Sequence, residues 1–111
     1  MTLDDYGDWA AAVANVRHGQ AVGRTKLAYL GLGIAGESGE VADAIKKLLR
    51  DGDDDLSDVA DELGDVIYYW ACLCRACGLA PSEILERSRA KIDGRLETVK
   101  PSRVVDEDPA G

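Results

Sequence analysis

The sequence of 111 residues contains no phenylalanine and a single histidine, His18. This scarcity excludes most forms of catalysis and metal binding that depend on several imidazoles. No run of about 20 apolar residues is present, so the sequence predicts no membrane-spanning segment. The chain begins Met-Thr-Leu-Asp-Asp, which is acidic where a secretory signal peptide is basic. We therefore expect a cytoplasmic protein.

Cysteine is also rare, and the three residues Cys72, Cys74 and Cys77 lie in one short segment. An odd number in one segment does not form a disulfide framework and is typical of a reducing compartment. A zinc site is disfavoured, because Cys72 and Cys74 point apart on a helix and no fourth cysteine exists. We interpret these residues as small core side chains, and His18 as a capping residue near a helix end.

Positive charge is scarce as well. The sequence contains 13 lysines and arginines and 21 acidic residues, which gives a net charge of −8. Such a protein is a poor partner for the backbone of DNA or RNA. It can still bind a small polyanion if a divalent cation lies between them. By length, the chain is one domain, predicted over residues 1–100, with a loose tail over residues 101–111.

The apolar residues recur at intervals of three and four, which predicts helices. The clearest series runs without interruption from Leu56 to Cys77. The predicted helices are Leu3–Arg17, a segment over Leu27 to Leu48, a segment over Leu56 to Cys77, and a fourth that starts near Ser82. The predicted fold class is all-α: an oligomeric four-helix-type bundle with a short disordered C-terminal tail.

Two pairs of carboxylates lie on or beside these apolar stripes. Glu37 occupies a core-facing position of the second predicted helix, and Glu40 follows three residues later. Glu62 and Asp65 repeat this spacing in the third predicted helix. Residues three apart share a helix face, so each helix directs a pair of acids toward apolar surface.

Burying one uncompensated carboxylate costs several kcal/mol, so four together require a positive partner. A hard divalent cation with oxygen ligands, Mg²⁺ with Mn²⁺ as a substitute, meets this need. Di-iron sites in carboxylate bundles also use histidines, which are absent between these helices. The competing interpretation is that the acids lie on an ordinary solvated face.

The segments Gly36-Glu37-Ser38-Gly39-Glu40 and Asp61-Glu62-Leu63-Gly64-Asp65 resemble the MazG-like nucleotide pyrophosphohydrolases. The family pattern is E-x-x-E followed by E-x-x-D, and 21 residues separate the two pairs here. The resemblance extends over Leu27 to Arg95. In the last helix Lys91 and Arg95 match the family pattern, whereas Ser88 replaces an asparagine.

This resemblance implies an all-α enzyme that uses Mg²⁺ to cut a nucleoside triphosphate between the α and β phosphates. It also implies dimers or tetramers whose sites are completed across subunits. Glu37, Glu40, Glu62 and Asp65 would hold the metal, and Glu37 or Glu40 would activate the attacking water. Contacts to the substrate are predicted for a further set of residues: Lys47, Arg50, Lys91 and Arg95 on phosphates, and Trp9 on the base.

Three functional hypotheses remain open: hydrolysis of nucleoside triphosphates, hydrolysis of phosphoribosyl-ATP, and binding of a metal or partner without turnover.

Two other sequence patterns are set aside. The G-x-G-x-x-G of Gly31, Gly33 and Gly36 lacks the flanking strands of a dinucleotide-binding fold. The acids from Asp51 to Glu62 resemble a calcium loop, but Leu56 stands where that loop needs glycine.

Overall fold

The computed structural model describes residues 1–17 and 23–98, and within them every regular element is an α-helix. The helices are α1 (Leu3–Arg17), α2 (Gly23–Asp51), α3 (Ser57–Ala76) and α4 (Pro81–Glu97). The all-α prediction is confirmed, and the predicted helices agree with the observed ones to within a few residues at most ends. His18 and the tail predicted over residues 101–111 lie outside the described residues.

Local hydrogen bonds explain where the helices begin and end. At the start of α1 the Thr2 hydroxyl accepts the Asp5 N–H at 3.0 Å, and the Asp5 carboxylate accepts the Thr2 N–H at 3.1 Å. This reciprocal pair satisfies donors that a helix start leaves free. At the end of α3, Gly78 takes a φ of 73°, and the N–H of Leu79 bonds to the carbonyl of Cys74 at 2.8 Å. Glycine ends a helix in this way because it lacks a Cβ.

The start of α4 differs in detail from the expectation. We expected Ser82 to begin the helix, but Pro81 is its first residue and Ala80 precedes it as the N-cap. Proline suits this position, because the first helical N–H has no partner within the helix. The Glu83 carboxylate accepts the Ala80 N–H at 3.2 Å. Ser82 is thereby left to bond outward to α1.

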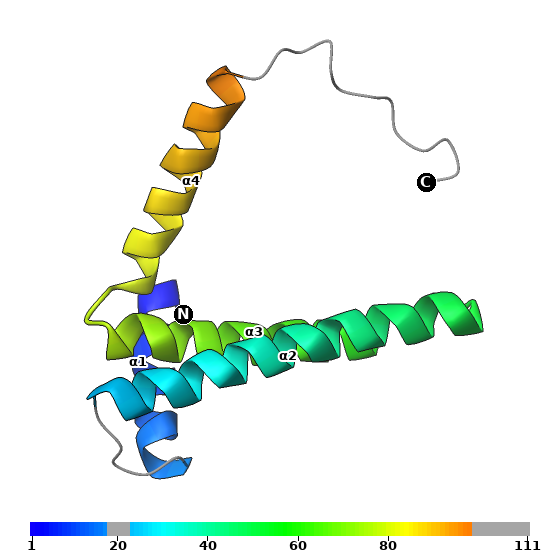
Figure 1. Cartoon of the computed structure of the whole chain (residues 1–111), viewed down its shortest axis with the longest axis horizontal. Coiled ribbons are helices and arrows are strands. Elements are labelled where there is room, and N and C mark those ends of the chain that lie inside the picture. The colour runs from blue at the N-terminus through cyan, green and yellow to red at the C-terminus, as the bar shows by residue number, and fades with distance from the viewer. Residues whose placement is uncertain (18–22, 99–111) are drawn as a thin grey trace.

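The four helices do not close into one bundle within a single chain (Figure 1). The helices α2 and α3 run side by side, and α1 packs across α3. The helix α4 contacts only α1 and α3, near its own start, and then projects away. No residue of α4 lies close to α2.

The core is small and is built largely from small side chains. Ala10 and Ala14 of α1 pack with Ala71 and Cys72 of α3, and Leu30 of α2 joins them. Small residues allow α1 and α3 to approach closely, and the Cys72 thiol donates a hydrogen bond to the Ala10 carbonyl at 3.5 Å. The prediction that the cysteines are core residues is correct for Cys72 and Cys74, whereas Cys77 is exposed.

Much apolar surface remains uncovered. In α4 the residues Leu85, Ile92 and Leu96 expose 49–62% of their surface. Leu32 and Leu49 of α2 are each 75% exposed. Exposed apolar surface on this scale typically marks an interaction site. None of the four helices in the described ranges is both long and apolar enough to span a membrane.

Candidate metal and nucleotide site

Three carboxylates from two helices meet at one point between α2 and α3. Glu37 comes from α2, and Glu62 and Asp65 come from α3. One oxygen from each of the three lies within 4.8 Å of the others. The three-residue spacing of Glu62 and Asp65 places both on the side of α3 that faces Glu37. We call these three residues the carboxylate cluster.

The cluster is electrostatically unfavourable on its own. Partial burial raises the pKa of Glu62, and the nearby carboxylates of Asp65 and Glu37 raise it further. Within the described ranges no lysine or arginine forms an ion pair with a cluster residue. The arrangement therefore favours either uptake of a proton or capture of a cation.

The burial of these acids is less complete than expected. Glu37 and Glu62 are half-buried, whereas Glu40 and Asp65 are exposed. The expectation that all four lie inside an apolar interior is therefore not met in the single chain. Glu40 stands outside the cluster, although its charge contributes to the raised pKa of Glu62.

The donor set suits a hard divalent cation. Carboxylate oxygens are the ligands that Mg²⁺ and Mn²⁺ prefer, and the cluster contains no nitrogen or sulfur ligand. The oxygens are close enough to share one ion after small side-chain rotations. Three carboxylate oxygens would not complete the octahedral coordination of Mg²⁺, so water or phosphate oxygens would supply the remaining ligands.

A cavity of about 480 Å³ adjoins this cluster, and Glu37 and Asp65 form part of its wall. The other lining residues are Tyr6, Trp9, Val13, Arg17, Gly64, Tyr68 and Tyr69. The volume is in the range of small-molecule binding sites. Trp9 is 54% exposed and contacts Tyr68 edge-on, with ring centroids 6.3 Å apart. The structure thus places Trp9 beside the cluster with part of its ring surface accessible.

Sequence reasoning identified Trp9 but missed the other aromatic residues of this cavity. The signal was available in α1, where Tyr6, Trp9, Val13 and Arg17 follow each other at steps of three, four and four. This spacing places them on one helix face. Burial raises the pKa of Tyr68 to about 12, so its hydroxyl stays protonated at neutral pH.

The predicted phosphate-binding residues of α2 are engaged locally. The Lys47 ammonium lies 2.8 Å from Asp43, and the Arg50 guanidinium lies 2.7 Å from Asp51. Both pairs are exposed, and such pairs contribute little to stability. Lys47 and Arg50 can therefore exchange their carboxylate partners for another anion.

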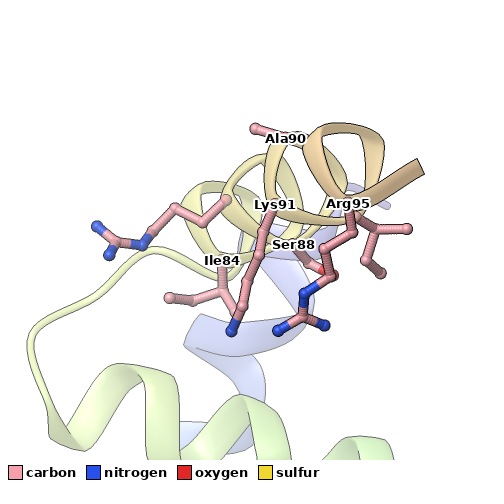
Figure 2. A pocket seen from close by; sticks show the side chains of 7 residues that line it. Ile84, Ser88, Ala90, Lys91 and Arg95 are labelled. Atoms are coloured by element: carbon pink, nitrogen blue, oxygen red, sulfur yellow. The ribbon is translucent and has the colours of Figure 1, made fainter. Parts of the chain in front are cut away.

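The predicted phosphate-binding residues of α4 lie apart from the cluster of their own chain. Lys91 and Arg95 line a separate hollow of about 590 Å³ together with Ser88. Figure 2 shows Lys91 and Arg95 extending to the same side of α4, with Ala90 on the opposite side. Since α4 does not approach α2, these cations do not reach Glu37 within one chain.

The glycine pattern that was set aside in the sequence is explained by the helix that contains it. Gly31, Gly33 and Gly36 all lie inside α2, so a dinucleotide-binding turn is excluded. At Gly33 the ring of Tyr69 occupies the place that a Cβ would take, which explains this glycine by close packing. Gly31 and Gly36 have open space at the same point.

Comparison with known proteins agrees with this geometry. The model of the MazG nucleotide pyrophosphohydrolase domain matches residues 25–100. The chain belongs to the MazG nucleotide pyrophosphohydrolase family. The match covers all three cluster residues and the whole of α4. The chain is also similar to the Gene 37 protein of Mycobacterium phage L5, with 36% identity over 76 residues, which is 64% of this chain and 67% of that protein. No solved structure matches the chain.

Proposed function

We propose that this MazG-family protein is a Mg²⁺-dependent nucleoside triphosphate pyrophosphohydrolase that converts a (d)NTP and water to a (d)NMP and pyrophosphate. The observation that carries the proposal is the carboxylate cluster of Glu37, Glu62 and Asp65 beside an aromatic-lined cavity. We further propose that it acts in the cytoplasm in cleansing of the nucleotide pool.

The carboxylates divide into two roles. Glu37, Glu62 and Asp65 would hold the divalent cation, whereas Glu40, which the sequence also predicts as a ligand, stands outside this group at the exposed edge. When bound, the cation neutralises phosphate oxygens and polarises the phosphorus that is attacked. One carboxylate must accept a proton from the attacking water. Of the predicted bases Glu37 and Glu40, we favour Glu40, because it stands outside the three closely grouped oxygens.

The cavity would hold the nucleoside. Trp9 offers a partly exposed ring of the kind on which bases stack. The charge of the triphosphate would be balanced by the cation and by basic side chains. Lys47 and Arg50 would contribute from α2, since their present partners are exposed acids.

We also propose that the active form is a homodimer or a homotetramer. The exposed apolar residues Leu85, Ile92 and Leu96 of α4 need a cover, and the long helices α2 and α3 carry exposed leucines of their own. A second copy packed on α4 would bring Lys91 and Arg95 of one chain toward the carboxylate cluster of the other. The four-helix arrangement expected from the sequence would then form between chains.

The proposal is tested by release of pyrophosphate from a panel of nucleotides with Mg²⁺ or Mn²⁺. We expect turnover of one or more (d)NTPs in the wild type, and a loss of at least about 100-fold in kcat/KM in Glu37→Gln. The panel includes phosphoribosyl-ATP, because selective hydrolysis of this compound would support a phosphoribosyl-ATP pyrophosphatase instead. Metal binding without turnover of any nucleotide would support a non-catalytic bundle.

A further inference from the structure

One face of α1 forms a continuous wall of the cavity. Tyr6, Trp9, Val13 and Arg17 all line it and span about 16 Å along the helix axis. Tyr6 is the first residue of this wall, and its ring centroid lies 5.4 Å from that of Trp9. Arg17 stands at the other end of the same wall. The cavity therefore combines the carboxylates of Glu37 and Asp65 with the guanidinium of Arg17.

Aromatic rings line much of this cavity. The ring centroids of Trp9 and Tyr68 are 6.3 Å apart, and those of Tyr68 and Tyr69 are 5.2 Å apart. The Arg17 guanidinium carbon lies 6.0 Å from the centroid of Tyr68. Trp9 and Arg17 thus both lie beside the buried ring of Tyr68. A nucleotide with its phosphates at the carboxylate cluster would place its base among these rings, with the outer edge toward Arg17.

The chemistry of Arg17 restricts which base edge can meet it. A guanidinium donates hydrogen bonds and accepts none. The Arg17 side chain is exposed, and within residues 1–17 and 23–98 it makes no ion pair. Two adjacent donors fit two adjacent acceptors. Guanine presents O6 and N7, and cytosine presents O2 and N3, whereas adenine places an amino donor beside each of its outer acceptors.

We propose that Arg17 reads the nucleobase and selects guanine or cytosine against adenine. This proposal rests on the proposed function, because it takes a nucleotide as the ligand of the cavity. Arg17 is then a specificity-determining residue that contacts the base and not the reacting phosphates.

The experiment measures binding separately from turnover. Isothermal titration calorimetry in the presence of Mg²⁺ compares the α,β-methylene triphosphates of guanosine, cytidine and adenosine, which cannot be cut at the α–β position. In the wild type we expect the guanosine or the cytidine analogue to bind about 5- to 150-fold more tightly than the adenosine analogue. The two analogues distinguish the purine from the pyrimidine ligand.

Variants of Arg17 separate base reading from a general charge effect. Arg17→Ala should lose the preference by weakening the favoured analogue while leaving the adenosine analogue unchanged. Arg17→Lys keeps the charge but loses the two-pronged geometry, so it should lose most of the preference too. The matched control is Arg24→Ala, since Arg24 is also exposed and does not line the cavity.

Three outcomes would overturn the proposal. They are equal binding of all three analogues by the wild type, an equal weakening of all three in Arg17→Ala, and an absence of binding of any of them. The first two leave the proposed function intact if pyrophosphate is still released. Failure of the proposed function shows separately, as no release of pyrophosphate from any nucleotide by the wild type.

Discussion

The Asp4 carboxylate of α1 accepts two hydrogen bonds from Ser82 at the start of α4, one from the backbone N–H at 2.8 Å and one from the hydroxyl at 2.6 Å. Beside them, Pro81 packs so tightly on Gly7 that a Cβ there would lie 2.8 Å from its ring. The hydrogen bonds connect residues 78 positions apart. They fix the direction in which α4 leaves the rest of the chain.

We predict that Asp4→Ala lowers the melting temperature and that Ser82→Ala lowers it less. The two changes should not add, because they remove the same interaction; a double-mutant cycle measures this coupling. Asp93→Ala is the control, since its carboxylate forms only an exposed pair with Arg89 on α4. Additive effects of Asp4→Ala and Ser82→Ala would contradict the prediction.

The hydrogen bonds between Asp4 and Ser82 also predict that the stability of the fold depends on pH. The Ser82 hydroxyl and N–H lower the pKa of Asp4 below its ordinary value of 3.8. A lowered pKa in the folded state stabilises the fold above pH 3.8, and this contribution is lost as the pH falls through the folded pKa. Wild type and Asp4→Ala should therefore converge in melting temperature at low pH. A difference that persists there would mean that the charge of Asp4 is irrelevant.

The raised pKa of Glu62 predicts a pH dependence of stability with the opposite sign. Its pKa is raised above 4.5, so the folded state holds the proton more tightly than the unfolded state. Its stabilising contribution is complete below pH 4.5 and is lost as the pH rises through the folded pKa. With EDTA present, Glu62→Gln should therefore melt above the wild type at neutral pH, by an amount that grows from pH 4.5 upward. The variant should also lose hydrolysis by at least about 100-fold.

The control for this prediction is Glu86→Gln, an exposed carboxylate of α4. Circular dichroism checks that helicity is kept. If Glu62→Gln melts at or below the wild type at neutral pH, the repulsion within the carboxylate cluster is not costly. If it retains hydrolysis near the wild-type rate, Glu62 does not hold the catalytic cation.

Divalent cations should relieve the repulsion among the carboxylates of the cluster and stabilise the folded protein. We predict that Mg²⁺ or Mn²⁺ raises the melting temperature of the wild type, because a ligand that binds only the folded state stabilises it by about 2.7 kcal/mol at a hundred times its Kd. Glu37→Gln should show a much smaller shift. The measurement is a thermal melt across a metal titration, with Ca²⁺ for comparison. Equal shifts in both proteins would place the bound metal elsewhere.

The sequence predicted the helices well because their signals are local. The apolar spacing of α3, for example, depends only on near neighbours in the chain. The paired acids were also found from the sequence, since burial of a carboxylate beside an apolar stripe is costly wherever it occurs. The spacing within each helix predicted which acids share a face.

What the sequence did not predict depends on contacts between distant segments. Ser82 looked like a helix cap, but its hydroxyl bonds to Asp4, and no local pattern encodes that partner. The cavity combines α1 with α2 and α3, so Tyr69 and Arg17 meet only after α1 has packed. The spread of α4 away from α2 was also missed, because a helical pattern defines a face without naming the chain that covers it.

Gly33 and Gly31 provide a matched pair of helix positions. Gly33→Ala should destabilise the protein by about 1–3 kcal/mol, because the new methyl group collides with the Tyr69 ring. Gly31→Ala meets nothing within 4 Å and should stabilise α2 by about 0.5–1 kcal/mol. Urea denaturation at neutral pH measures both. Stabilisation by both substitutions would show that Tyr69 moves aside without cost.

The last prediction concerns a site shared between chains. Glu37→Gln removes a carboxylate of the cluster, and Arg95→Ala removes a cation of α4, so each variant alone should be inactive. If Arg95 of one chain serves the cluster of another, an exchanged heterodimer contains one intact site. Random mixing should then restore about one quarter of the wild-type activity, since half the dimers are mixed and each has one good site of two. A mixture of Glu37→Gln with Glu62→Gln is the control, because both defects affect the same cluster and no intact site can form. Activity that stays at the level of the separate variants would place Arg95 outside the shared site.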